Sequence, residues 1–202
     1  MNSALFALAV AYLAGAIPFG YLLVKLRTGR DVRRSGSGNI GATNVMRTTG
    51  LRAGAATLAL DVAKGWFAVW FMDRMTGGQA AWMCVAAVAV MLGHVFPVFL
   101  RFRGGKAVAT FFGAWFYLAP LPVAAVLLLF VATVLYSRHV SMGSVAAAGA
   151  FPFGVWMIEH PGPVMVLAAL ISGALVVWRH RDNIRRIRDG SESAIAFRKS
   201  PR

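Results

Sequence analysis

Acidic residues are scarce in this chain of 202 residues: seven Asp and Glu stand against 21 Lys and Arg, which gives a net charge of +14. Charged residues of both signs make up 14% of the chain, whereas soluble domains have about 25%. Apolar residues make up 58%, and the mean hydropathy is +0.65. A chain of this length has too little interior to hide that much apolar surface from water. The composition therefore excludes a soluble globule, and we expect membrane topology rather than a nucleic-acid partner to explain the excess of bases.

Cysteine is also scarce, because Cys84 is the only one and no internal disulfide can form. The sequence has no CxxC pair and no Cys/His ligand spacing, so a structural zinc site is not expected. Clusters of carboxylates that would hold magnesium are missing as well, and we predict neither a metal nor a cofactor. Without a Ser-His-Asp arrangement or a Gly-x-Ser-x-Gly segment, a covalent acyl-enzyme is disfavoured.

Long apolar runs dominate the rest of the chain and predict one all-α membrane domain over residues 1–202, since a helix needs about 20 residues to cross the hydrocarbon layer. The run 107–137 is too long for one span, and Pro120 and Pro122 near its middle favour two short helices. The sequence thus predicts seven transmembrane helices, over 4–26, 53–72, 79–100, 107–118, 123–137, 143–158 and 163–178.

The distribution of basic residues supports this number of spans. With seven helices, 19 of the 21 Lys and Arg fall on one side of the membrane. Lys and Arg gather in cytoplasmic loops, so that side is predicted to be the cytoplasm. The N-terminus is then outside and the C-terminus is cytoplasmic. With six spans, the basic tail would lie outside.

The first cytoplasmic loop, residues 35–47, reads Ser-Gly-Ser-Gly-Asn-Ile-Gly-Ala-Thr-Asn-Val-Met-Arg. Its glycines permit positive φ and let backbone N–H groups converge into an anion-binding nest. Arg47 offers a two-pronged grip on phosphate. The alternative is a flexible polar loop without a ligand. The predicted phosphate-binding residues are Asn39, Gly41, Thr43 and Asn44.

A second cytoplasmic segment places Gly104 and Gly105 directly before the predicted helix 107–118. We expect bare backbone donors and a positive helix end there, with Lys106 adding a point charge for phosphate. A basic residue beside a span is otherwise an ordinary interfacial anchor. His94, inside the third span, is either a helix–helix hydrogen-bonding group or part of a site.

Two further charges, Asp61 and Lys64, lie three residues apart within the second span and can pair on one helix face. An unpaired charge at that depth would be costly, so structural pairing is favoured over direct chemistry.

The tail from residue 179 onward is strongly basic, yet His180 and Asn183 fall with Ile184 and Ile187 at helical spacing. A purely amphipathic anchor would have an apolar face there, so His180 and Asn183 indicate a site that returns to the helices. The short loop 138–144 adds the hydroxyls of Ser141 and Ser144, which we also predict to bind phosphate.

Three ordered segments make the sequence similar to the bacterial acyl-phosphate:glycerol-3-phosphate acyltransferase family. They are residues 35–47, Gly-His-Val-Phe-Pro with Gly-Gly-Lys in 93–106, and Arg-His-x-x-Asn-Ile-x-Arg-Ile-x-x-Gly-x-Glu in 179–192, and the resemblance also includes Asp61-x-x-Lys64-Gly65. It implies transfer of a fatty acyl group from acyl phosphate to the 1-hydroxyl of glycerol 3-phosphate. The products would be lysophosphatidic acid and inorganic phosphate. The implied location is the bacterial inner membrane, with the active site facing the cytoplasm.

The resemblance also implies roles for single residues. Catalytic importance falls on Ser35 or Ser37, Arg47, His180 and Asn183, glycerol-phosphate binding on Gly104, Gly105 and Lys106, and a structural role on Glu192. Ala107 stands where the family often has another glycine. The proton acceptor is left open between His180 and a phosphate oxygen of the donor.

The expected partners are glycerol 3-phosphate, acyl phosphate, membrane lipids and a soluble enzyme that produces acyl phosphate. A transporter of a phosphorylated metabolite is the alternative, but its site should lie near the midplane with access from both sides. A lipid-binding scaffold would not need glycine nests.

Overall fold

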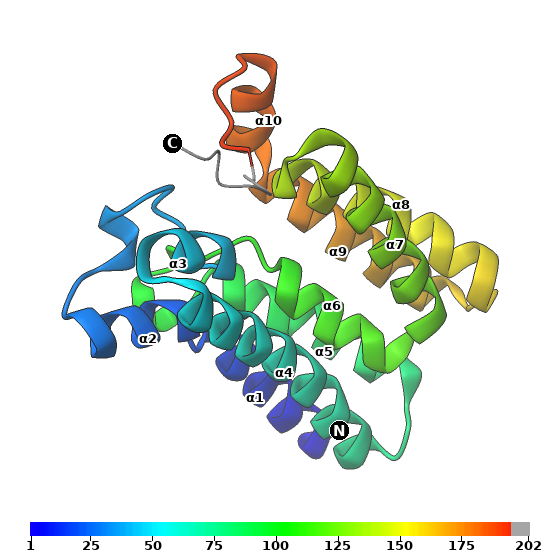
Figure 1. The fold of residues 1–202 in the computed structure, drawn as a ribbon. Coiled ribbons are helices and arrows are strands. Elements are labelled where there is room, and N and C mark those ends of the chain that lie inside the picture. The colour runs from blue at the N-terminus through cyan, green and yellow to red at the C-terminus, as the bar shows by residue number, and fades with distance from the viewer. Residues whose placement is uncertain (195–202) are drawn as a thin grey trace, which may run out of the picture. The chain divides into compact units, whose positions relative to one another are not determined.

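A computed structural model describes residues 1–194, in which the chain forms helices and no strand (Figure 1). The predicted all-α class is therefore confirmed. Contacts group the chain into two compact units, Met1–Pro120 and Leu121–Arg202.

Unit 1 is built around α4, which packs against α1, α5 and α6. Glycines make these contacts close. Gly65 on α4 lies directly against the backbone of α6 at Thr110, and Gly93 on α5 lies against that of α1 at Tyr12, so a side chain at either glycine would overlap backbone atoms. The helices of the unit are α1 Asn2–Ala16, α2 Phe19–Thr28, η1 Val32–Arg34, α3 Ala42–Thr49, α4 Leu51–Thr76, α5 Ala80–Val95, η2 Val98–Leu100 and α6 Val108–Leu118.

Unit 2 consists of α7 Pro120–Ser137, α8 Val140–Glu159, α9 Pro163–Arg179 and the short basic helix α10 Arg181–Arg188. Helix α8 packs against α9, and α10 contacts both. Gly143 on α8 lies against Phe130 and Val134 of α7. These contacts join the four helices of the unit.

The helices follow the predicted spans, with two differences in detail. The break before α7 falls at Ala119, next to the prolines that predicted it. The predicted first span is bent by 41° between α1 and α2, because Pro18 has no N–H to continue the helix. In the described chain, four helices are long and apolar enough to cross a membrane, or six if each bent pair is one span. The predicted fourth span is α6, with 11 residues. Seven spans and their sidedness stay predictions.

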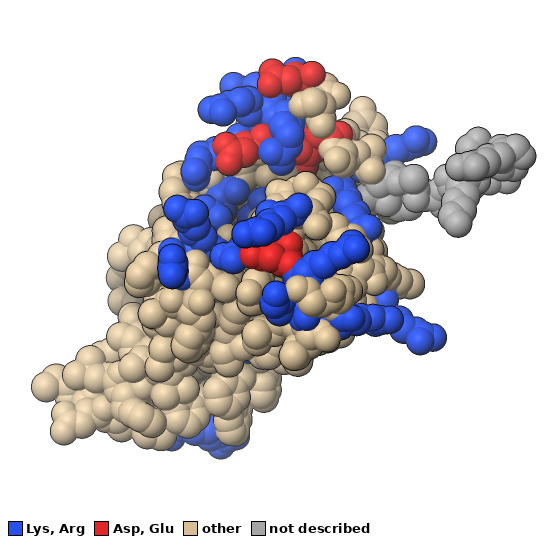
Figure 2. Space-filling view, turned by 90° about the vertical axis from the view of Figure 1, so that its left-hand side faces the viewer, with Lys and Arg blue, Asp and Glu red and all other residues tan. Residues whose placement is uncertain are grey.

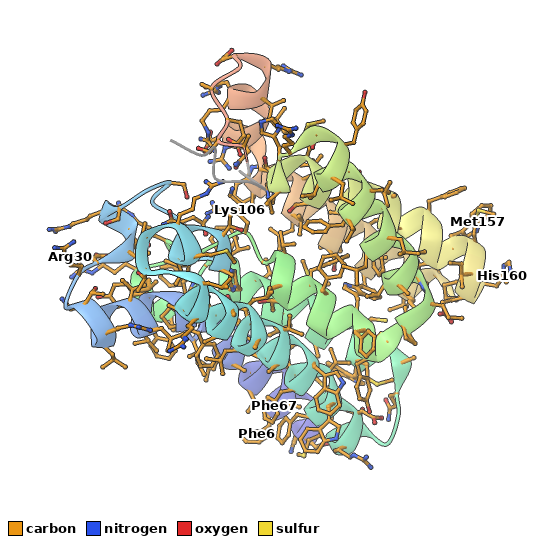
Figure 3. All side chains as sticks on the ribbon, in the orientation of Figure 1. Phe6, Arg30, Phe67, Lys106, Met157 and His160 are labelled. Atoms are coloured by element: carbon orange, nitrogen blue, oxygen red, sulfur yellow. The ribbon has the colours of Figure 1, made fainter. Side chains whose placement is uncertain are left out.

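Basic residues are unevenly distributed over the surface. The face drawn in Figure 2 has its lysines and arginines crowded together and leaves a broad area in which they are nearly absent. Within unit 1, Figure 3 shows Arg30 and Lys106 in the part that carries α2 and α3, and Phe6 and Phe67 away from it. The polar segments of unit 1 therefore lie at the same end of its helices.

Candidate active site

The loop over residues 35–47 is organised by the side chain of Asn44, which is only 2% exposed. Its Oδ1 accepts the N–H of Ser37 at 2.9 Å, while its Nδ2 donates to the carbonyls of Ser35 at 3.1 Å and Asn39 at 2.8 Å. One amide thus satisfies several backbone groups that the turn leaves without helical partners. Gly36, with φ +58°, lies so close that a Cβ there would overlap Asn44 Oδ1.

These bonds correct part of the predicted phosphate site. Asn44 uses its amide to hold the loop, so it positions the loop rather than binding phosphate. The N–H of Gly41 donates to Asn39 Oδ1 at 2.8 Å, and the N–H of Gly38 donates to the Ser35 carbonyl at 3.1 Å. The predicted nest of backbone N–H groups is therefore smaller than expected, because the turn uses the N–H groups of Gly38 and Gly41 internally.

The groups that remain open for an anion lie at the start of α3. Within residues 1–194 the backbone N–H groups of Ala42 and Thr43 have no partner, and neither do the hydroxyls of Ser35 and Ser37. The N-terminus of a helix attracts anions through its N–H groups and its dipole. Thr43 and Arg47 are exposed on the same helix. Unit 1 thus offers one anion-binding element here.

Asp31, which precedes η1 and this loop, is paired with its neighbour Arg33. Asp31 accepts a two-pronged bond from the Arg33 guanidinium, with Nη2 at 2.7 Å from Oδ2 and Nε at 3.0 Å from Oδ1. The hydrogen bonds and charge of Arg33 lower the pKa of Asp31 to about 2. Asp31 therefore stays ionised at neutral pH, with Arg33 as its counter-ion.

The second segment is a tight loop whose glycines are already bonded. The N–H of Gly104 donates to the Val95 carbonyl and that of Gly105 to the His94 carbonyl, both at 3.1 Å. The expectation of bare donors at these glycines is wrong, because the loop folds back on the end of α5. Lys106, which follows them, is half-buried and leads into α6. It is the cationic group that this loop presents beside the helix start.

This loop also contains strained backbone. Arg101, Phe102 and Ala107 adopt left-handed φ values of 52°, 61° and 58°. Such a conformation costs a non-glycine residue about 1–2 kcal/mol and persists only where packing enforces it. Ala107 stands where the resemblance expects glycine, and its positive φ gives the physical reason for that preference.

A shared apolar cluster holds the two segments of unit 1 together. Leu100 of the second segment packs with residues of the first, and Tyr12 on α1 donates its hydroxyl to the Phe96 carbonyl at 2.8 Å. The cluster consists of Val24, Val32, Ile40, Val45, Ala53 and Leu100. The start of α3 and the Lys106 loop are thus parts of one packed unit.

Beneath that loop lie buried charges. Lys64 Nζ is 2.8 Å from Asp61 Oδ1, so the predicted pairing on α4 is present. His94 Nδ1 lies 3.7 Å from the same carboxylate oxygen and 3.3 Å from Thr110 Oγ1. Asp61, Lys64 and His94 are each at most 5% exposed. They contact protein groups within unit 1 and not solvent.

In unit 2 the predicted residues gather around Glu192. Its Oε1 accepts from Ser141 Oγ at 2.7 Å and from Asn183 Nδ2 at 2.6 Å, and its Oε2 accepts from Arg186 Nε at 2.7 Å. Burial raises the pKa of this carboxyl, but the three hydrogen bonds and the Arg186 charge outweigh it and lower the pKa overall. Glu192 therefore fastens the segment after α10 to α8 and α10.

This arrangement changes the roles predicted for the two serines. Ser141 donates its one hydroxyl hydrogen to Glu192, and Ser144 donates its own to the Val140 carbonyl at 2.9 Å. A serine hydroxyl has one hydrogen to give, so neither can also donate to a phosphate as arranged here. Both serines are structural, which corrects their assignment to phosphate binding.

His180 and Asn183 keep the features of site residues. They are 2% and 6% exposed, at the junction of α9 and α10. His180 Nδ1 lies 2.8 Å from the Val176 carbonyl, which can only accept, so Nδ1 carries the hydrogen.

Sequence reasoning missed three contributing residues. Thr110 contacts His94, Tyr12 holds the start of the second segment, and Arg186 completes the bonds to Glu192. Thr110 stands four residues after Lys106, which is a usable signal once a helix is assumed there. Tyr12 and Arg186 act through contacts that only the fold creates.

Comparison with known proteins decides the family. The sequence profile described as glycerol-3-phosphate acyltransferase matches residues 5–190. The chain belongs to the glycerol-3-phosphate acyltransferase family. It is 47% identical over 195 residues to the glycerol-3-phosphate acyltransferase of Geotalea daltonii, covering 96% of this chain and 99% of the relative. It is 44% identical to that of Geobacter sulfurreducens, covering 92% and 94%.

Solved structures agree with this assignment. The chain is similar to the crystal structure of PlsY (YgiH), an integral membrane glycerol 3-phosphate acyltransferase, in its glycerol 3-phosphate form. The TM-score is 0.91 and the identity is 36%, with 96% of each chain covered. The lysophosphatidic acid form of PlsY gives a TM-score of 0.87 at 34% identity, again with 96% of each covered. This chain is therefore a membrane-embedded acyltransferase of phospholipid biosynthesis.

Proposed function

We propose that this enzyme transfers a fatty acyl group from acyl phosphate to the 1-hydroxyl of glycerol 3-phosphate. The products are lysophosphatidic acid and inorganic phosphate. The observation that carries the proposal is the pair of anion-binding elements packed together in unit 1: the open start of α3 with Arg47, and Lys106 before α6. The reaction brings two phosphate groups together. The glycerol 3-phosphate and lysophosphatidic acid forms of PlsY support this acceptor and this product.

The chemistry needs little activation of the leaving group. The hydroxyl oxygen of glycerol 3-phosphate attacks the acyl carbonyl carbon, a new C–O ester bond forms, and the bond from that carbon to the phosphate oxygen breaks. The electron pair of the broken bond and the hydroxyl proton both end on the departing phosphate. Holding two anions side by side supplies proximity. Arg47 stabilises the negative charge as it moves to the departing phosphate, and Lys106 holds the phosphate of glycerol 3-phosphate.

We further propose that the protein crosses the bacterial inner membrane seven times, with its N-terminus outside and its site facing the cytoplasm. The basic residues of unit 1 support this sidedness, because Arg30 and Lys106 lie at the end that carries α2 and α3 (Figure 3), whereas Arg74 is near the far end of α4. Acyl phosphate then arrives from the soluble enzyme that produces it, and the product stays among the membrane lipids.

The reaction is tested with the purified protein in detergent. Phosphate release should require both acyl phosphate and glycerol 3-phosphate, and lysophosphatidic acid should appear in equal amount. A reaction without protein measures spontaneous hydrolysis of the mixed anhydride. Release that does not depend on glycerol 3-phosphate, or an absence of turnover, would contradict the proposed reaction.

The orientation is tested by cysteine labelling in intact cells. In a Cys84→Ala background, a membrane-impermeant maleimide should label Gln79→Cys, which is exposed between α4 and α5 and borders the predicted outer loop 73–78. It should not label Arg30→Cys or Asp189→Cys until the cells are permeabilised. Labelling of either from outside would overturn the proposed topology.

A further inference from the structure

The buried polar side chains of α4, α5 and α6 form one connected cluster. Asp61, Lys64, His94 and Thr110 are 2%, 5%, 3% and 0% exposed. Lys64 is 2.8 Å from Asp61, His94 is 3.7 Å from Asp61, and Thr110 is 3.3 Å from His94. Polar groups this deep in an apolar domain are costly, and ion pairs among them are poor sources of stability. Their contacts instead hold two neighbouring segments of unit 1 in place.

One edge of the cluster is fixed to the bend between α1 and α2. Lys64 Nζ donates to the Ile17 carbonyl at 2.9 Å, next to Pro18 where the helix is interrupted. A backbone carbonyl freed by such an interruption needs a donor inside the protein. Lys64 therefore has two fixed partners, and through Asp61 it fixes the side of the His94 ring that carries Nδ1.

The other edge of the imidazole faces the loop that carries Lys106. A Cβ built on Gly105 would overlap His94 Nε2 and come within 3.1–3.2 Å of Cδ2 and Cε1. Gly105 also donates its N–H to the His94 carbonyl at 3.1 Å. Its φ is not positive, so the ring and not the backbone conformation is what excludes a side chain there. The Gly105 Cα thus rests directly on the ring.

We propose that His94 is a positioning residue for the acceptor phosphate, acting through Gly105 on Lys106. Asp61 and Thr110 hold the ring on one side. The opposite edge of the ring fixes the position of the Gly105 backbone in the loop that carries Lys106. A displacement of the ring displaces the Lys106 backbone, and with it the ammonium group. The kinetic part of this inference rests on the proposed function, in which Lys106 binds glycerol 3-phosphate.

The test is a double-mutant cycle on His94 and Gly105. Gly105→Ala introduces the overlapping Cβ, and we expect the KM for glycerol 3-phosphate to rise at least tenfold and the Tm to fall. His94→Asn keeps a polar group near Thr110 and Asp61 but lacks Nε2 and Cε1. Alone it should raise that KM several-fold, because the loop loses its support. In the double variant the new methyl group fills the space, so KM and Tm should both be better than in Gly105→Ala.

Gly104→Ala is the matched control. A Cβ there would overlap the His94 carbonyl and lie against Pro97 and the Val95 carbonyl, which His94→Asn leaves in place. His94→Asn should therefore rescue Gly105→Ala and not Gly104→Ala. The KM for acyl phosphate should change less than twofold in the rescued double variant His94→Asn/Gly105→Ala.

The outcomes distinguish a structural contact between His94 and Gly105 from a positioning role of His94. Recovery of Tm without recovery of KM would show a structural contact alone and would overturn positioning. Simple addition of the two defects in both measurements would overturn the contact itself. The Tm cycle does not depend on the reaction, so it decides the contact even if the turnover assay contradicts the proposed function.

Discussion

Replacing Arg47 with alanine is expected to lower kcat by about 100-fold or more while the protein still inserts and folds. Removal of one preorganised donor from a site where charge develops costs about 10²–10³ in rate. The helix that carries Arg47 is firmly fixed, since Val45 is fully buried and Asn44 is bonded to the loop. The backbone that carries the guanidinium is therefore in place before phosphate binds. Single-turnover and steady-state phosphate release measure this change.

Two variants make the result specific. Arg47→Lys should recover only part of the activity, because an ammonium cannot bond phosphate in the same two-pronged way. Arg52→Ala removes an exposed arginine from the first turn of α4 and should leave kcat within twofold. Near-normal turnover of well-folded Arg47→Ala would reassign Arg47 to membrane anchoring.

Replacing Lys106 with alanine is expected to raise the KM for glycerol 3-phosphate by about ten- to hundredfold with little change in kcat. A lysine–phosphate contact is a charge-assisted hydrogen bond that contributes about 1.5–3 kcal/mol, and each 1.4 kcal/mol is about tenfold. If the contact is equal in the ground and transition states, its loss appears in KM alone. Steady-state kinetics with each substrate varied in turn measures both constants.

The control for this variant is Lys25→Ala, because Lys25 is exposed and donates to the Gly29 carbonyl at the end of α2. It should leave both KM values unchanged. Lys106→Arg should recover only partly, since the planar guanidinium replaces a compact ammonium beside a tight loop. A rise in the KM for acyl phosphate alone would show that Lys106 holds the donor, and the two phosphate sites would have to be exchanged.

The helices could be predicted from the sequence because apolar runs and prolines act locally. The break at Ala119 follows from Pro120 and Pro122, and the bend after Ile17 follows from Pro18, a signal that the prediction of one span over 4–26 overlooked. The pairing of Asp61 with Lys64 also followed from spacing on one helix. Each of these features depends on residues that are neighbours in the chain.

The corrected residues depend on partners that no local pattern reveals. Asn44 was predicted to bind phosphate, but its amide meets backbone groups five to nine residues away that only the folded turn brings near. Ser141 meets Glu192, 51 residues further on. A hydroxyl or amide has a fixed number of hydrogen bonds to give. Which partner takes them is decided by the fold, so residue type alone could not separate binding groups from structural ones.

The short helix α6 has a consequence for where the acceptor travels. Its Thr110 is joined through His94 to Asp61, ten residues after the start of α4, or about 15 Å along that helix. The loop that carries Lys106 therefore opens well below the first turn of α4, while α6 itself is only about 16 Å long against about 30 Å of hydrocarbon. We expect water-soluble glycerol phosphate to reach this lysine from the end of unit 1 that carries α3 (Figure 3), and a product with a fatty acyl chain to leave into the surrounding lipid.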